Sequence, residues 1–519
     1  MRVINIVLTF LIFLAAALLA PPTFAAGHAS HVVLMVWDGM RADFVSDETT
    51  PTLSALARNG VTFLHHHSVY PSMTEVNATA LSTGVYPRES TMLANNEYRP
   101  AYDPSGPIGT DATSSARKGD ELTGGHYLAF PTLAEILQRH GLRTAVAGSK
   151  QVALLHDRSE RGDDALNVDV FAGHALPKSM EQTLADALGR FPVPYPAKIR
   201  QDEWTTRALT SVLWKDQVPA FSLLWMAEPD FSQHGTGPGS KRSLAAIKSS
   251  DDNLARVLRV LDEKNLRDST DVIIVSDHGF STILANIDIS TNFRAAGFNA
   301  ATSFPAPGPK SGDIMVVGNG GQIACYVIGH DTGIVTRLVH FLQTQPFTGV
   351  LFTSAPVNGT FPLSDAGLDA DSQADVVIAV RWKPAQSQYG APSFIYDDGG
   401  SLRPGQGQHA SLSPFDMHNI CFAAGPDFAK GMKDSLPSGN MDIAPTVLWI
   451  LGIEAEKKQS GRVLTEALTV PGPKIESCES FHRQAAWDGD NVHWRQYLDV
   501  SSVNGEIYLD EGNGALVSQ

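Results

Sequence analysis

The chain of 519 residues is long enough for one large domain with insertions or for two or three average domains, and its 43% hydrophobic residues can bury a sizeable core. Its 55 acidic and 39 basic residues give a formal net charge of −16, without basic runs. This charge argues against a protein that binds nucleic-acid backbones, and it allows for carboxylates gathered around cations.

Residues 1–26 have the pattern of a secretory signal peptide. Arg2 gives a short positive segment, residues 4–20 are almost wholly apolar, and the small residues of TFAAG predict cleavage near Ala25 or Ala26. The alternative is an uncleaved membrane anchor. No later segment approaches the ~18 uninterrupted apolar residues of a membrane span. The sequence therefore predicts an exported protein, periplasmic or secreted, with no membrane span after signal removal.

From residue 32 onward, short apolar runs alternate with segments of helical period. The predicted strands are residues 32–37, 221–226 and 271–276, and the predicted helices are residues 50–60, 131–141 and 243–265. Each strand is a solid apolar run, as expected where helices cover both faces of a sheet. The pattern predicts an α/β domain with a mostly parallel sheet and helices on both faces.

Three stretches depart from this alternation. Residues 99–127 are rich in Gly, Pro, Ser and Asp without periodicity, which predicts a long loop. Residues 281–400 carry strand and helix signals of their own, which predicts a cap inserted into a core of residues 27–470. Residues 471–519 are predicted to form a C-terminal extension, in which two β-rich runs flank the hairpin signal Asn504-Gly505.

The three cysteines, Cys325, Cys421 and Cys478, are too few for a disulfide framework in a chain of this size. At most one bridge is possible, and the odd count leaves one thiol over. Cys325 and Cys421 lie in apolar runs and are predicted to be buried as small hydrophobic residues.

Side chains with metal-ligand chemistry lie near the ends of the predicted strands. In an open parallel sheet, ligands bind outside the carboxyl ends of the strands. The polar residues near these ends are all carboxylates or imidazoles: Asp38, Asp230, His234, Asp277, His278 and, before the run HNICFAAG, His409. Singly, each has an ordinary explanation as a turn, a cap or a helical pair.

Together, three carboxylates and three imidazoles at one rim predict a metal centre. That much buried negative charge is costly unless cations offset it. Zinc takes His nitrogen and Asp oxygen with about four ligands, so six side chains and one bridging substrate group fit two metal ions. A pair of divalent cations ~4 Å apart suits phosphoryl or sulfuryl transfer.

The segment YPSMTEVN, residues 70–77, holds a candidate nucleophile. It is predicted to be a loop that enters a short helix, whose N-terminal N–H groups favour a phosphate anion. Metal contact lowers the pKa of a hydroxyl, so Thr74 has a chemical role beside such a centre. The residues alone leave two alternatives equal, because Thr74 could attack a substrate or its hydroxyl could cap the helix.

The chain resembles the alkaline phosphatase superfamily, and within it the nucleotide pyrophosphatase/phosphodiesterase branch. The resemblance covers roughly residues 30–455. It rests on an ordered set of motifs: VVLMVWDGMR, TPTLSALARNGVTF, YPSMTEVNATALSTGVYP, LANNEYRP, EPDFSQHGTGP, VIIVSDHGF, GQHASLSPFDMHN and MDIAPTVLWILG. Single motifs are weak, but all of them in this order are highly specific.

The resemblance implies a metal-dependent hydrolase of small-molecule phosphate esters with two divalent metal ions, zinc. The implied ligands are Asp230, His234 and His409 for one metal, and Asp38, Asp277 and His278 for the other. Thr74 would contact the metal and attack in line to give a covalent phosphothreonine, which a water then hydrolyses. Asn95, in LANNEYRP, would hydrogen-bond a phosphate oxygen together with the backbone N–H of Glu75.

Two departures from the family pattern bear on the site. Nucleotide-cleaving members commonly place an aromatic residue after the nucleophile to stack on the base, and here that residue is Glu75. The metal-binding histidine usually begins a His-Gly pair, and here the pair is His409-Ala410. Glu75 and Tyr98 are the predicted substrate contacts.

Other functions stay open. On the same fold, a threonine nucleophile would also serve a phosphonate hydrolase or a phosphomonoesterase. A sulfatase-like hydrolase is a further alternative, although the sequence has no Cys-x-Pro-x-Arg motif. An exported binding protein that has lost catalysis would lack a ligand or the nucleophile, and neither is missing.

The tract His65-His66-His67 also looks like a set of metal ligands. A strand here would send alternate rings to opposite faces, so the tract is predicted to be structural or solvated. His418 is predicted to support the site or to cap a helix. Ser72 and Asn77 flank Thr74 and are predicted to hydrogen-bond its loop.

Overall fold

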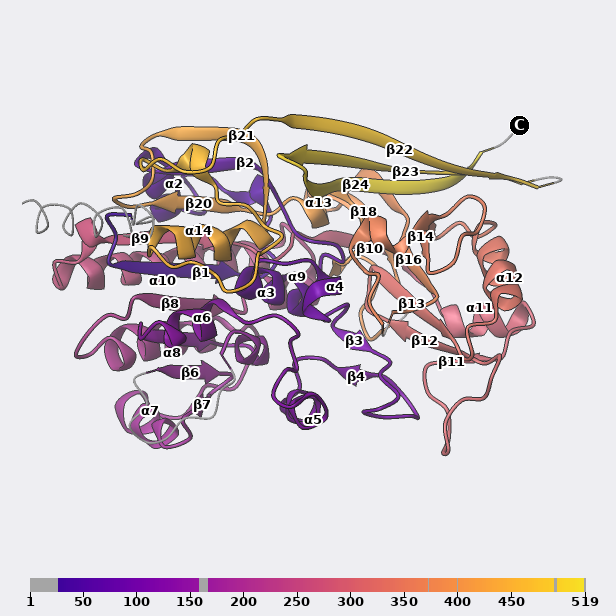
Figure 1. Ribbon diagram of the computed structural model, residues 1–519, viewed down its shortest axis with the longest axis horizontal. Coiled ribbons are helices and arrows are strands. Elements are labelled where there is room, and N and C mark those ends of the chain that lie inside the picture. The colour runs from indigo at the N-terminus through magenta and orange to yellow at the C-terminus, as the bar shows by residue number, and fades with distance from the viewer. Residues whose placement is uncertain (1–26, 158–166, 372, 399, 490–491, 518–519) are drawn as a thin grey trace, which may run out of the picture.

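The computed structural model describes residues 27–157, 167–371, 373–398, 400–489 and 492–517 (Figure 1). The predicted signal peptide lies outside the described residues. Within them the largest sheet has nine strands, in the order β21-β2-β20-β9-β1-β8-β5-β6-β7. Their bounds are β1 (His31–Trp37), β2 (Val61–His67), β5 (Thr144–Gly148), β6 (Val168–Phe171), β7 (His174–Leu176), β8 (Phe221–Met226), β9 (Thr270–Val275), β20 (Cys421–Ala424) and β21 (Met432–Gly439).

The sheet is mostly parallel, as predicted. Strands β9, β1, β8, β5 and β6 run in one direction, whereas β20 and β7 are antiparallel to their neighbours. Alternate residues of β1 enter two separate apolar cores, with Val32, Leu34 and Val36 in one and Val33, Met35 and Trp37 in the other. This period of two explains why the strand reads as a continuous apolar run.

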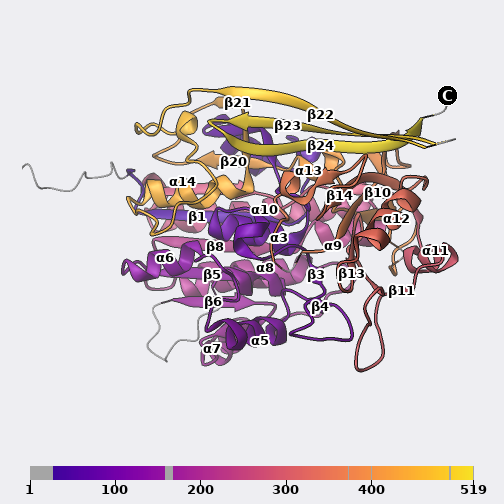
Figure 2. The same cartoon turned by 45° about the vertical axis from the view of Figure 1, so that its right-hand side comes forward.

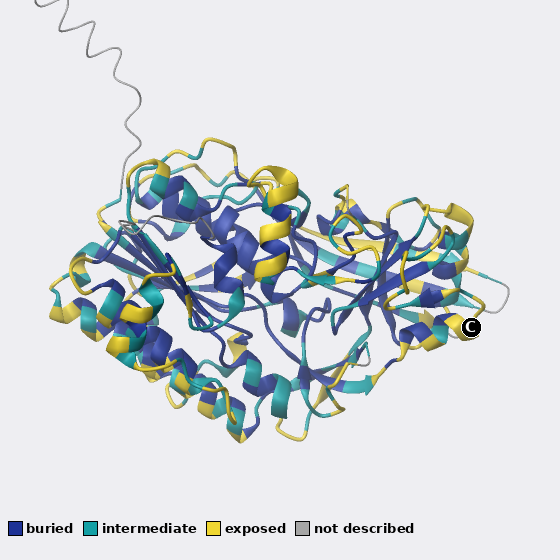
Figure 3. Cartoon of the chain, turned by 90° about the horizontal axis from the view of Figure 1, so that it is seen from below, coloured by how far each residue is buried: buried dark blue, intermediate teal, exposed yellow. Residues whose placement is uncertain are grey.

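Helices cover both faces of this sheet (Figure 3). The helices on one face are α3 (Thr74–Thr83), α6 (Leu133–Arg139) and α14 (Ile443–Ile450), and those on the other are α2 (Pro51–Arg58), α8 (Ile199–Arg207) and α10 (Lys241–Glu263). The three predicted strands and three predicted helices are all present. Across the described ranges, no helix has the length and apolarity that crossing a membrane requires.

The prediction of a loop over residues 99–127 is wrong in part. This stretch contains β4 (Ile108–Gly109), which pairs with β3 (Asn96–Glu97), and the helix α5 (Thr113–Thr123). The buried residues of α5 are small, and a side chain at Gly119 would collide with the ring of Tyr127. Because the buried face of α5 has no large apolar residues, the helix leaves no hydrophobic periodicity in the sequence.

Residues 281–400 build most of a second body beside the nine-stranded sheet (Figures 1 and 2). A six-stranded sheet contains β11 (Ala300–Ala301), β12 (Ile314–Gly318), β13 (Gln322–Val327), β16 (Val376–Val380), β14 (Thr348–Thr353) and β15 (Phe361–Pro362). A four-stranded sheet contains β17 (Trp382–Gln386), β18 (Pro392–Asp397), β10 (Ser281–Asn286) and β19 (Gly407–Gln408). The helices α11 (Ile289–Ala295) and α12 (Thr332–Leu342) share an apolar core with the six-stranded sheet.

The C-terminal residues form a three-stranded sheet that lies across the top of both bodies in Figures 1 and 2. Its strands are β22 (Cys478–Asp488), β23 (His493–Val503) and β24 (Glu506–Val517). β23 and β24 pair antiparallel on either side of Asn504-Gly505, where the sequence predicts a hairpin. β24 contacts both β2 and β14. The extension thus packs on the two bodies at once.

The cysteines are distributed between the core and the surface. Cys325 in β13 and Cys421 in β20 are buried, as predicted, and Cys478 in β22 is exposed. All three are free thiols in the structure.

Replacing Trp494 of β23 by alanine is expected to destabilise the protein by about 3–5 kcal/mol. Its indole is fully buried in the core of the second body, and Nε1 donates to the carbonyl of Gly359 at 3.2 Å. Chemical denaturation measures the free energy of unfolding. Phe481→Ala in the neighbouring strand β22 is the control, because this ring is 44% exposed. Equal losses in the two variants would contradict a structural role for the docked extension.

Candidate metal centre

The strand ends bring the six predicted side chains together. Asp38 directly follows β1, and Asp277 and His278 come just after β9. Asp230 and His234 lie one helical turn apart on α9 (Asp230–Thr236), just after β8. The sixth side chain, His409, directly follows β19 of the second body. Residues far apart in the sequence therefore meet where the two bodies adjoin.

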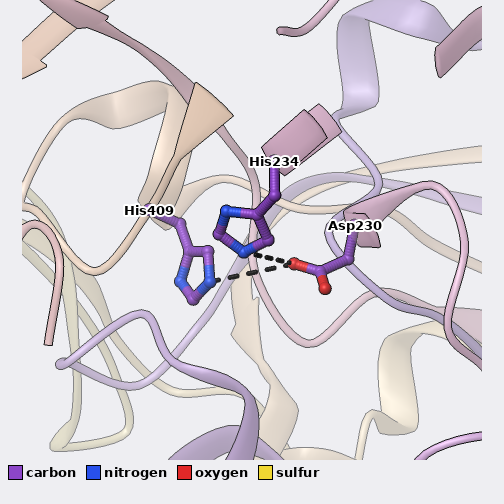
Figure 4. Close-up of side chains that lie close together, drawn as sticks. All are labelled: Asp230, His234 and His409. Carbon is purple, nitrogen blue, oxygen red and sulfur yellow. Dashed lines mark ion pairs between the residues drawn. The ribbon is translucent and has the colours of Figure 1, made fainter. Parts of the chain in front are cut away.

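Asp230 belongs to two groups of these side chains, and Figure 4 shows the one that it forms with His234 and His409. Its Oδ1 is 3.1 Å from Nε2 of His234 and 3.8 Å from Nε2 of His409. A second group contains Asp38, Asp230 and His278, and within each group the ligand atoms lie within 4.8 Å of one another. Asp277 is next to the second group, because its Oδ2 is 3.3 Å from Nε2 of His278.

All three histidines are held in the same tautomer. Nδ1 of His234 lies 3.0 Å from the carbonyl of Gly407, Nδ1 of His278 lies 2.9 Å from that of Gly279, and Nδ1 of His409 lies 2.9 Å from that of Ser72. Because a carbonyl only accepts, Nδ1 carries the proton in each ring. Each Nε2 of a neutral ring therefore presents a lone pair to the carboxylates, which is the arrangement of histidines that bind metals.

The carboxylates are also arranged for cations. Asp38 Oδ1, Asp230 Oδ1 and Asp277 Oδ2 are buried, and within the described residues none of them receives a hydrogen bond. Burial raises the pKa of Asp38 to about 7, with a further rise from the charge of Asp277. Buried anionic oxygens without donors are costly, and divalent ions would offset that cost. The donor set of carboxylate oxygens and imidazole nitrogens fits zinc.

Thr74 points its hydroxyl toward this centre and away from the helix that it begins. It is the first residue of α3, whose N-cap is Met73, and no side chain caps the helix. The Oγ1 of Thr74 is 3.2 Å from Nε2 of His278. The capping alternative for Thr74 is therefore wrong.

Asn77 holds the loop that precedes Thr74. Its Oδ1 accepts from the N–H of Val69, and its Nδ2 donates to the carbonyls of Val69, Pro71 and Met73. Ser72 Oγ donates to the carbonyl of Ser411, next to the segment that carries His409. Both residues therefore hydrogen-bond the loop, as the sequence predicts.

Glu75 follows Thr74 in the sequence and hydrogen-bonds Asn95. The N–H of Glu75 donates to Oδ1 of Asn95 at 3.1 Å, which leaves the Asn95 amide nitrogen as a donor. The Glu75 side chain is buried, and burial followed by the charge of Asp111 raises its pKa well above the usual range. Tyr98 is buried elsewhere, since its ring packs against Tyr326 and its hydroxyl donates to the carbonyl of Pro104.

One residue of the histidine tract, His66, supports the centre through hydrogen bonds. Nδ1 of His66 lies 2.9 Å from Ser438 Oγ, and its Nε2 lies 3.0 Å from Asn440 Oδ1. Asn440 in turn donates to the carbonyl of Asp277 and to Asn77 Oδ1. His66 is therefore structural, as predicted, and it couples β2 to the end of β9. Asn440 was not predicted, because nothing local marks it in the sequence.

Lys150 is the residue at the centre that sequence reasoning missed. Its Nζ lies 2.8 Å from Asp38 Oδ2, 3.2 Å from Asp230 Oδ2 and 3.5 Å from Thr74 Oγ1. It lies two residues beyond the end of β5. The polar residues just beyond the other apolar runs predict the rest of the centre, and the same rule, applied to the run TAVAG, predicts Lys150 as well.

Ala410 explains one departure from the family pattern. It follows His409 with φ +79°, which lies in the left-handed region that favours glycine. A His-Gly pair would adopt this backbone without strain, so the alanine is a change of residue and not of geometry.

Comparison with known proteins places the chain in a family. The sequence pattern of the family described as Type I phosphodiesterase / nucleotide pyrophosphatase matches residues 32–333, more than half of the chain. The chain belongs to this family. Five of the six clustered side chains lie within the matched residues, and the sixth, His409, lies beyond them.

Similar proteins agree with this assignment. Venom phosphodiesterase 2 of Crotalus adamanteus is 23% identical over 282 residues, which are 54% of this chain and 30% of that protein. Ectonucleotide pyrophosphatase/phosphodiesterase family member 1 of Homo sapiens is 22% identical over 249 residues, 48% of this chain and 23% of that protein. The matched part thus spans less than a third of the length of these relatives.

A solved structure shows the same fold. An inactive form of murine ectonucleotide pyrophosphatase / phosphodiesterase 5, in complex with AMP, matches with a TM-score of 0.59 and 15% identity. The match covers 85% of this chain and all of that chain. The predicted α/β architecture is thereby confirmed.

Asn77→Ala is expected to lower the free energy of unfolding by about 2–4 kcal/mol, because it leaves the N–H of Val69 and other buried polar groups unpaired. Urea denaturation checks the loss. Asn59→Ala is the control, because Asn59 is exposed and its amide donates to a single carbonyl. A loss no larger than in the control would show that Asn77 does not hold the nucleophile loop.

Proposed function

We propose that this protein is an exported phosphoric ester hydrolase that uses two divalent metal ions, zinc, and acts as a phosphodiesterase or nucleotide pyrophosphatase through a phosphothreonine intermediate. One observation carries the proposal. Thr74 Oγ1, at the start of a buried helix, lies 3.2 Å from Nε2 of His278, in a centre where three carboxylate oxygens lack donors. Membership in the phosphodiesterase family supports the reaction, and the pattern of residues 1–26 supports export.

The residues of the centre divide into two ligand sets. We assign Asp230, His234 and His409 to one ion, and Asp38, Asp277, His278 and the Thr74 hydroxyl to the other. When bound, the ions would lower the pKa of the hydroxyl and of a water and offset the negative charge of the carboxylates. The carbonyls that accept from each Nδ1 keep the three imidazoles oriented toward the ions.

Thr74 acts as the nucleophile in the first of two steps. Its Oγ1 forms a bond to phosphorus while the ester P–O bond breaks, and the alcohol leaves with the hydroxyl proton. Water then cleaves the Thr–O–P bond and restores the hydroxyl. The Asn95 amide nitrogen would donate to a non-bridging oxygen as negative charge develops on it.

The substrate class is inferred from the relatives and from the residue that follows Thr74. The related proteins are described as phosphodiesterases and ectonucleotide pyrophosphatases, and one is bound to AMP. Glu75 occupies the position after the nucleophile, where a carboxyl cannot stack on a base. We therefore propose a small phosphate ester as the substrate, with a substituent that hydrogen-bonds Glu75 rather than stacking on an aromatic ring.

Thr74→Ala is expected to reduce hydrolysis of bis-p-nitrophenyl phosphate at least about 1,000-fold, because the attacking oxygen is gone. The assay uses purified protein supplied with zinc. Thr83→Ala is the matched control on the same helix, because the Thr83 hydroxyl only bonds back to the carbonyl of Thr79. Wild-type turnover in Thr74→Ala would overturn the covalent mechanism.

Mass spectrometry of metals is expected to find two zinc ions in each wild-type chain and about one in His409→Ala. Trp225→Phe removes the donor to Asp38 Oδ2 and is expected to weaken zinc binding about 10-fold. Trp214→Phe is its control, because that buried indole donates to Ser222, away from the centre. Wild-type protein with far less than one metal per chain would favour a binding protein without catalysis.

A further inference from the structure

Lys150 brings a fixed positive charge into the metal centre. Its side chain is 19% exposed, and its ammonium spans the two ligand sets through Asp38 and Asp230. No motif behind the family resemblance contains it, since it lies between the matched segments LANNEYRP and EPDFSQHGTGP. The residue before Lys150 is held in place just beyond β5, which ends at Gly148. The Ser149 hydroxyl donates to Asp202 Oδ1 and accepts from the N–H of Ala227.

Lys150 contacts the Oδ2 atoms of Asp38 and Asp230, two carboxylates whose Oδ1 atoms lack donors and would bind the proposed metal ions. Once Asp38 and Asp230 serve as ligands, their charge is shared with cations, and a mostly buried ammonium requires another anion. Thr74 Oγ1 is 3.5 Å from Lys150 Nζ, and phosphorus is bonded to that oxygen during the reaction. A non-bridging phosphoryl oxygen is therefore within reach of the ammonium. Glu75 and Asp111 also act on Lys150 through their charge.

The charge of the loaded centre then favours one class of phosphate. Three ligand carboxylates and two divalent ions carry a single net positive charge, and Lys150 raises it to two. A phosphodiester has one negative charge, whereas a phosphomonoester near neutral pH carries about two, with a second pKa near 6. Lys150 adds one positive charge to the centre whatever the charge of Glu75 and Asp111, so the centre favours the monoester more with Lys150 than without it.

We propose that Lys150 binds a non-bridging oxygen of the transferred phosphoryl group and that this contact gives the site a second activity, the hydrolysis of phosphomonoesters. The inference rests on the proposed function. Thr74 Oγ1 bonds to phosphorus as the P–O bond to the alcohol breaks, and the alcohol leaves with the hydroxyl proton. Water then cleaves the phosphothreonine, which releases inorganic phosphate and restores the hydroxyl.

This second activity would add a second hydrolysis to the reaction sequence. Hydrolysis of a diester releases one alcohol and a monoester, and the same site would accept that monoester as its next substrate. Lys150 would therefore allow one protein to take a diester to two alcohols and inorganic phosphate, without a separate phosphatase.

The test compares Lys150→Gln with the wild type on p-nitrophenyl phosphate and on bis-p-nitrophenyl phosphate, with zinc content measured for both proteins. We expect kcat/KM for the monoester to fall about 100-fold and that for the diester to fall less than about fivefold. Lys198→Gln is the matched control, because this nearby lysine lies over the ring of Phe231. Equal losses for both esters, or the same loss in Lys198→Gln, would overturn the proposal.

Binding of inorganic phosphate to the zinc-loaded protein separates this inference from the proposed function. Titration calorimetry should show weaker phosphate binding by Lys150→Gln, about 10-fold or more, with zinc content unchanged. Equal phosphate affinities would show that Lys150 is only a counter-ion for the carboxylates. Diester turnover without monoester turnover in the wild type would also overturn the inference, while the proposed function stands. Phosphate binding that depends on Lys150, without any diester turnover, would instead overturn the proposed function.

Discussion

The burial of three carboxylates at the carboxyl end of one sheet is the constraint on which this structure depends. Asp38 and Asp277 are fully buried and Asp230 nearly so, and each has an oxygen without a donor. Such a concentration of negative charge is costly in a protein interior. The neighbouring groups include three imidazoles, which with the carboxylates form groups that could hold metal ions, and one ammonium between the carboxylates.

Strand order makes this concentration possible. β1 has β9 on one side and β8 on the other, all three parallel and in register. The residues just beyond these strands therefore leave the sheet at one edge, which brings positions 38, 230 and 277 together. β5 is the next strand beyond β8, so Lys150 reaches the same edge. The two apolar cores hold the strands rigidly, which fixes the spacing of the polar groups.

A segment of the second body and the residues just after β21 complete the centre. His409 follows β19, which pairs with β10 of the four-stranded sheet. The hydrogen bond from His409 Nδ1 to the carbonyl of Ser72 ties that segment to the nucleophile loop. Asn440 connects His66, Asn77 and the backbone of Asp277 in one buried network. Displacement of either segment would therefore disturb the loop before Thr74 together with the clustered side chains.

The sequence by itself determined the elements and the chemical types at their ends. Apolar runs and helix signals predicted the strands and helices, because burial of a strand between two helical layers demands continuous hydrophobicity. The strand-end rule selected Asp38, Asp230 and Asp277, since parallel strands deliver their ends to one edge. The helix α5 escaped prediction because its buried face is made of small residues.

Only the tertiary structure decided which groups meet. It brought His409 to Asp230 across 179 positions of the sequence (409 against 230), turned the Thr74 hydroxyl away from its helix, and gave His66 a structural partner in Asn440. It also placed Lys150 between two carboxylates. The physical reason is that local patterns set the conformation of each segment, whereas long-range packing sets which segments are neighbours. A polar side chain acquires its role from those neighbours.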